Sequence, residues 1–164
     1  MKEIKLTIDG EEVQLTDEQW RFLRTIEKEK HPFERAYYGC YYFCISSLGS
    51  IESYGDFRDR EADAFFKEVN YFSTRPFANQ VALHQLLYRK LLKFSYENKC
   101  ADVEWNGRND HWCIYYNPDD FKYCVAGFAS HKFDSVWFSS EDAAERAIEE
   151  VVKPFVKEHP EFVW

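Results

Sequence analysis

The chain has 164 residues, a formal net charge of −8 and an aromatic content of 19%. This length is enough to bury the core of one domain, and the negative charge argues against a general binder of nucleic-acid phosphates. No apolar run approaches the roughly 18 residues that cross a membrane, and the five cysteines come without a secretory signal. We therefore expect a cytosolic protein whose thiols stay reduced.

Residues 1–31 predict a β-hairpin followed by a helix. The turn is Asp9-Gly10, because glycine tolerates the positive φ that a two-residue turn requires. This turn sets the register of three opposed pairs: Leu6 with Val13, Ile8 with Glu11 and Ile4 with Leu15. Thr16 then caps a helix over residues 17–30.

Residues 37–98 predict a first unit of three strands and a helix. The strands, in chain order, are residues 41–45, 50–54 and 71–72. Ser73 or Thr74 caps the long helix, which ends near residue 96 and has Pro76 in its first turn. Residues 55–69 are ambiguous between a loop and a short helix.

Residues 105–158 predict a second unit of the same kind. Its strands, in chain order, are residues 111–116, 121–126 and 136–138. A four-residue turn at 117–120 would place Ile114 opposite Tyr123, and therefore Cys113 directly opposite Cys124. The helix starts after Ser139 or Ser140, and Pro154 is expected to kink its last turn.

The two units share a short sequence element. Tyr71-Phe72-Ser73-Thr74, followed by Ala78, reappears as Trp137-Phe138-Ser139-Ser140, followed by Ala144. In both places a strand ends in phenylalanine and a hydroxyl residue able to cap a helix follows. We therefore predict an α+β fold for a single domain, residues 1–164: an amino-terminal hairpin and helix, then two related units of three short antiparallel strands plus a helix.

Several segments occur here in a characteristic order: the Asp-Gly hairpin, Tyr71-Phe72-Ser73-Thr74, Leu91-Leu92-Lys93-Phe94, Cys113-Ile114-Tyr115-Tyr116-Asn117 and the stretch from Val136 to Glu150. Together they resemble a large group of short open reading frames from phages and prophages of Gram-positive gut bacteria. The resemblance implies a phage accessory protein that binds and disables a host component in the host cytosol. It assigns no catalytic residues. The strand–strand–strand–helix unit is also similar in topology to the DNA-binding arm domain of phage integrases.

The sequence contains no motif that announces a metal, a cofactor or a catalytic nucleophile. The five histidines do not form a zinc-ligand pair, and no glycine-rich phosphate loop is present. Two readings of the cysteines stay open. Cys113 could act as a nucleophile with His111 as its base. Cys113 could also form a reversible disulfide with Cys124, although cysteines of this kind are more often buried thiols.

We expect a non-enzymatic protein that binds a host protein with a basic surface, such as a defence or nucleic-acid-processing factor. Surplus aromatic residues and the negative charge favour such an interface. The predicted binding residues belong to the second hairpin and its turn: Tyr115, Lys122, Asp119 and Asp120. The ring and the carboxylates could engage an arginine or lysine of the partner.

Two other functions are kept as alternatives. The first is a nucleic-acid-binding module in which Trp112, Tyr115 and Tyr116 stack on bases; the negative charge disfavours it. The second is a small cysteine-dependent enzyme that uses Cys113.

Overall fold

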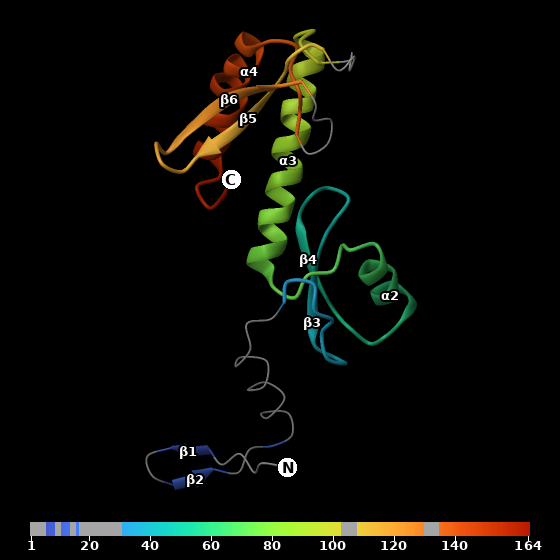
Figure 1. Cartoon of the computed structure of the whole chain (residues 1–164). Coiled ribbons are helices and arrows are strands. Elements are labelled where there is room, and N and C mark those ends of the chain that lie inside the picture. Colours follow the sequence, from blue (N-terminus) through green and yellow to red (C-terminus); the bar gives the residue numbers. More distant parts are fainter. Residues whose placement is uncertain (1–5, 9–10, 14–15, 17–30, 103–107, 130–134) are drawn as a thin grey trace.

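The computed structural model describes residues 6–8, 11–13, 16, 31–102, 108–129 and 135–164 (Figure 1). It consists of short antiparallel hairpins and helices, which confirms the predicted α+β class. The elements are β1 (Leu6–Ile8), β2 (Glu11–Val13), β3 (Tyr41–Ile45), β4 (Ile51–Gly55), α2 (Arg60–Lys67), α3 (Arg75–Glu97), β5 (His111–Asn117), β6 (Lys122–Phe128), α4 (Glu141–Ala147), the π-helical turn η1 (Ile148–Val152) and α5 (Lys153–Glu158).

β1 and β2 form the predicted amino-terminal hairpin. Leu6 opposes Val13, and Ile8 opposes Glu11, as the Asp-Gly turn requires. The predicted pair of Ile4 with Leu15 and the predicted helix over residues 17–30 lie outside the described residues.

Each of the two units joins its hairpin to its helix through one residue. Phe72 exchanges two backbone hydrogen bonds with Phe43 of β3, of 2.9 and 2.8 Å, and Phe138 exchanges two with Trp112 of β5, of 3.1 and 2.7 Å. The third strand that the sequence predicts in each unit is thus a single bridging residue. The repeated element in the sequence therefore corresponds to a repeated structural unit.

In both units the helix that follows the bridging residue starts after a hydroxyl residue with an extended backbone, Thr74 before α3 and Ser140 before α4. The predicted side-chain cap forms at α4, where the Ser140 hydroxyl accepts a hydrogen bond from the Ala143 N–H at 3.2 Å. The cap predicted for α3 is wrong, because Thr74 makes no side-chain cap hydrogen bond and the Ser73 hydroxyl donates to the His31 carbonyl at 3.0 Å. Ala78 and Ala144 are both fully buried. The alanine that recurs in the sequence therefore marks where each helix packs closely on its own unit.

Among the described residues, only the first unit has a helix, α2, between its second strand and its bridging residue. It lies between β4 and Phe72, and the Asp59 carboxylate caps it by accepting a hydrogen bond from the Ala62 N–H at 2.8 Å. This helix resolves the ambiguity of residues 55–69, because aspartate at the N-cap satisfies a backbone donor of the first turn.

The second hairpin forms with a register two residues away from the predicted one. Ile114 opposes Val125 and not Tyr123. The loop moves to residues 118–121 because the Asn117 side chain accepts a hydrogen bond from the backbone of the loop, and because Phe121 adopts a positive φ of 53°. A slip of two residues leaves every side chain on its predicted face of the sheet.

The predicted direct opposition of Cys113 and Cys124 is therefore wrong. Cys113 opposes Ala126, and Cys124 opposes Tyr115, so the two cysteines are diagonal neighbours. Diagonal pairs stand roughly 7–8 Å apart, farther than the Cα atoms of a disulfide. None of the five cysteines forms a disulfide.

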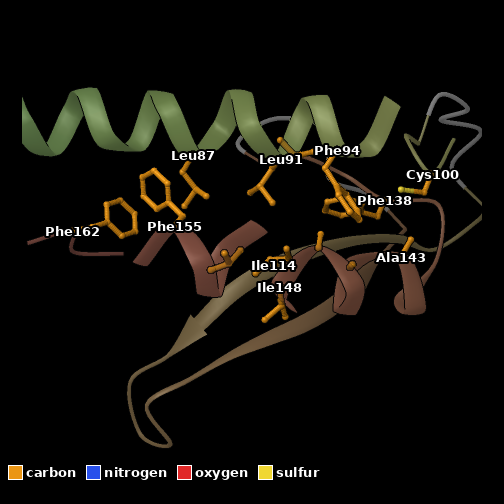
Figure 2. Close-up of a cluster of buried hydrophobic side chains, with 14 of the residues drawn as sticks. Leu87, Leu91, Phe94, Cys100, Ile114, Phe138, Ala143, Ile148, Phe155 and Phe162 are labelled. Atoms are coloured by element: carbon orange, nitrogen blue, oxygen red, sulfur yellow. The ribbon is translucent and has the colours of Figure 1, made fainter. Parts of the chain in front are cut away.

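The larger core lies between α3 and the second unit (Figure 2). Leu87, Leu91 and Phe94 point from α3 towards the hairpin and the last helices. They are packed with Ile114 and Phe138, which are 6% and 0% exposed. The face of the hairpin that carries Ile114 is thus its core face, as the sequence predicts.

The backbone of the last helix changes from an α-helix to a wider π-helical turn just before Pro154. α4 passes into the π-helical turn η1 and then into α5, with Pro154 in the first turn of α5. In a regular α-helix the proline ring clashes with the carbonyl four residues earlier, and a π-turn relieves this clash by widening the backbone. The kink predicted at Pro154 takes the form of this π-turn.

Asp56 at the end of β4 holds the first unit together. It is fully buried, and its carboxylate accepts hydrogen bonds from Arg35 Nε (2.9 Å), the Arg58 backbone N–H (2.9 Å) and the Tyr71 hydroxyl (2.8 Å). Arg35 also bonds Asp63 of α2 at 2.6 Å. Burial by itself raises the pKa of a carboxyl group, but these hydrogen bonds, led by Arg35, outweigh it and hold the pKa of Asp56 at about 2.

We predict that Asp56→Asn lowers the free energy of unfolding by about 3 kcal/mol, because it removes one partner of a buried ion pair. The folded-state pKa of Asp56 lies below its ordinary value of 3.8. Its stabilising contribution is therefore present above about pH 4 and is lost as the pH falls towards about 2. Urea unfolding across this range should give a steeper loss of stability for the wild type than for Asp56→Asn.

The exposed Asp119→Asn is the matched control and should change stability by less than about 0.5 kcal/mol. Equal pH slopes for the wild type and Asp56→Asn would show that Asp56 does not act in this way.

Candidate functional site

A groove of about 980 Å³ lies between the second hairpin and the last helices. Residues 121–125, mostly of β6, form one side, and α4 with η1 forms the other. Figure 1 shows β6 on the side of the hairpin away from α3. The charged residues that line the groove are Lys122, Glu141, Asp142, Glu145, Arg146, Glu149, Glu150 and Lys153.

The outer edge of β6 has no strand partner among the described residues. The backbone N–H and C=O groups of Trp112 bond Phe138 and therefore point away from β6. Along an antiparallel ladder, every second residue points its backbone groups away from the partner strand. In β5 these residues are Trp112, Ile114 and Tyr116. Their partners in β6, which are Gly127, Val125 and Tyr123, therefore point their own backbone groups away from β5, to the outer edge of the hairpin. Within the described part of the chain, none of these three makes a backbone hydrogen bond beyond the hairpin.

The helix side of the groove carries exposed carboxylates. Glu141, Asp142 and Glu145 are exposed, and no described residue forms an ion pair with any of them. Acidic residues in the first turn stabilise a helix through its dipole, which accounts for Glu141 and Asp142. Glu145 lies one turn further along and lacks this structural role.

The remaining charges of the groove are mostly neutralised. Arg146 Nε pairs with Glu150 at 3.2 Å, and Lys153 pairs with Glu149. Lys122 has no ion-pair partner among the described residues. Carboxylates therefore dominate the electrostatics of the groove, with their negative potential concentrated at the start of α4.

The hairpin tip forms one end of the groove. Asn117 Nδ2 donates to the Asp120 carboxylate at 3.1 Å, so Asp120 helps to shape the turn. Phe121 lines the groove with 80% of its surface exposed. An exposed phenylalanine beside carboxylates is a typical anchor residue, and the sequence analysis missed it because the predicted register placed Phe121 inside the ladder.

The structure separates the four predicted binding residues into three places. Lys122 lines the groove, whereas Asp119 and Asp120 are exposed at the hairpin tip. Tyr115 lies on the face of the hairpin opposite Ile114 and is 42% exposed. Its ring is therefore near the groove residue Cys124 but does not line the groove itself.

The aromatic residues proposed for base stacking do not share a surface. Trp112 packs partly buried against the larger core, and Tyr116 contacts the Tyr123 ring with centroids 5.3 Å apart. Tyr115 points to the other face, because successive residues of a strand alternate. These three rings therefore do not form the stacking platform that the nucleic-acid alternative requires.

His111 has a carboxylate partner that the sequence analysis did not foresee. Its Nδ1 contacts Asp102, a residue outside the hairpin. Such a pair would orient the imidazole beside Cys113, but His111 is 1% exposed and Cys113 is 8% exposed. This pair is therefore closed to a substrate in the described conformation.

The described residues contain no cluster of three or more histidine, cysteine, aspartate or glutamate side chains able to hold a metal ion. Nor does any described helix combine the length and the apolar character that a membrane crossing needs.

Comparison with known protein families, curated proteins and solved structures found no match. The resemblance to phage reading frames therefore stays a prediction, and the function rests on the geometry of the site.

We predict that Tyr115→Ala changes the free energy of unfolding by less than about 1 kcal/mol, since the ring is on the outer face of a two-stranded hairpin. The adjacent Ile114→Ala should cost about 2–5 kcal/mol, because Ile114 belongs to the core. Chemical unfolding of the two variants measures this difference. A cost for Tyr115→Ala as large as that for Ile114→Ala would place Tyr115 in the core.

Proposed function

We propose that this chain is a non-enzymatic binding protein whose groove beside β6 holds an extended, basic segment of a partner protein. The observation that carries the proposal is the coincidence of an open strand edge and a carboxylate wall along one groove. A segment that pairs with a strand edge gains backbone hydrogen bonds and presents alternate side chains to each side. The resemblance to phage reading frames favours a host protein as the partner.

The proposed segment lies antiparallel or parallel to β6 and bonds the outward backbone groups of Tyr123, Val125 and Gly127. Every second side chain of the segment then points towards α4. A lysine or arginine at these positions meets Glu141 or Glu145, and such charge-assisted hydrogen bonds are stronger than neutral ones.

Phe121 adds a contact at the end of the groove. Its exposed ring offers an apolar face to the bound segment and can stack with a guanidinium group. The partner chemistry that fits best is therefore a strand-forming segment with cationic side chains at alternate positions and at least one arginine near the hairpin tip.

We expect a display library of short random peptides, selected on the full chain, to yield peptides with lysine or arginine at every second position. Binding of a selected peptide, followed by fluorescence anisotropy, should weaken as salt is added, because salt screens exposed charges. Selection of neutral or acidic peptides, or of none, would refute the proposed partner chemistry.

The double variant Glu141→Gln with Glu145→Gln should weaken binding of that peptide by roughly two- to tenfold, the effect of removing two exposed ion pairs. The matched control is Glu61→Gln in α2 with Glu68→Gln at its C-cap, which removes the same charge from another part of the surface and should leave the affinity unchanged. Equal weakening in both variants would mean that only net charge matters.

N-methylation of the peptide backbone tests strand pairing directly. Only alternate residues of an added strand bond the edge of β6, so methyl groups on one set of alternate amides should abolish binding, whereas methyl groups on the other set should be tolerated. Tolerance of both sets would exclude pairing along β6 and leave a purely electrostatic contact.

A further inference from the structure

A second recess, of about 440 Å³, lies between α3, β5 and the segment 161–164. This volume is within the range of small-molecule sites. Its floor consists of side chains that are less than a tenth exposed: Leu87, Leu91, Ile114, Val136 and Phe162. Figure 2 shows Leu87 and Leu91 on the side of α3 that faces Ile114.

One wall of this recess is held in place by a side-chain clamp. The Gln80 amide donates to the Glu161 carbonyl at 2.6 Å and accepts from the Val163 N–H at 3.0 Å. His84 bonds the Gln80 carbonyl at 2.8 Å, and its ring lies 4.7 Å from that of Phe162. The segment 161–164 is thus fixed against α3.

The mouth of the recess carries polar groups from one face of α3. Gln85, Tyr88 and Arg89 all line it, and residues three and four apart on a helix are neighbours. None of their side chains makes a hydrogen bond or ion pair with a described residue. By contrast, the next cation of the helix, Lys90, pairs with Glu158 at 3.7 Å.

We propose that this recess binds a small amphipathic carboxylate. The carboxylate bonds the Arg89 guanidinium, whose planar fork matches a carboxylate with two hydrogen bonds, and Tyr88 and Gln85 supply further donors. The alkyl or aryl part of the ligand covers the floor and is removed from water. This site uses none of the residues of the groove beside β6, so it stands independently of the proposed protein binding.

Titration calorimetry of the full chain with octanoate, octanol and octylamine at one ionic strength tests this proposal. The three probes share an alkyl chain and differ in charge. Octanoate should bind one site saturably and more tightly than octanol, with octylamine weakest. Equal affinities for octanoate and octanol, or no saturable binding of octanoate, would overturn the proposal.

Two variants one residue apart identify the charge that matters. Arg89→Gln should weaken octanoate binding by roughly tenfold or more, as expected for loss of hydrogen bonds to a charged group, and leave octanol unchanged. Lys90→Gln should leave both affinities unchanged. Both side chains are exposed, so both variants should fold, which thermal melting checks. An unchanged octanoate affinity in Arg89→Gln would overturn the assignment.

The position of the ligand is tested through Trp164, which lines the recess. Octanoate should change the tryptophan fluorescence of the wild type, and Trp164→Phe should remove most of this change while calorimetry still detects binding. A full fluorescence change in Trp164→Phe would place the carboxylate elsewhere on the protein.

Discussion

One pair of backbone hydrogen bonds decides how each unit of this protein is arranged. Phe72 bonds Phe43, and Phe138 bonds Trp112. The bridging residue occupies the edge of the first strand of its hairpin and positions the helix that starts shortly afterwards. The first strand then has a bonded neighbour on both of its edges, the bridging residue on one and the second strand on the other. The outer edge of the second strand is the edge of the hairpin that stays without a strand partner among the described residues. In the second unit this edge belongs to β6, so the groove is a consequence of the bridge.

The two units are stabilised by different interactions. In the first, the buried carboxylate of Asp56 connects Arg35, Tyr71 and, through Arg35, helix α2. Its contribution depends on ionisation and is lost in acid. In the second, α3 and α4 cover the core face of the hairpin with apolar side chains, and burial of apolar surface does not depend on pH. The first unit also has a buried apolar cluster, which includes Tyr42, Cys44 and Ala62, so its ion pair adds a pH-dependent contribution to an apolar core.

The candidate site could be predicted only in part. The sequence places Lys122, Asp119 and Asp120 at a hairpin end, because Asn-Pro-Asp-Asp is a turn signal, and the structure agrees. It could not join them to Glu141 and Glu145, which belong to a later helix and come near β6 only through tertiary packing. Phe121 was missed because its positive φ, 53°, depends on loop geometry that residue type does not reveal.

The sequence by itself determined the local elements: the Asp-Gly hairpin, the starts of the two helices to within one residue, and the repeated unit. Turn, cap and periodicity signals act between residues close in the chain, so they can be read there. Only the tertiary structure decided the register of β5 with β6, the reduction of each third strand to one bridging residue, and the two recesses beside the second hairpin. The bridges and the recesses depend on contacts between segments far apart in the chain, whose packing no local pattern specifies. The register depends on the positive φ of Phe121 in the hairpin loop, which the residue type does not reveal.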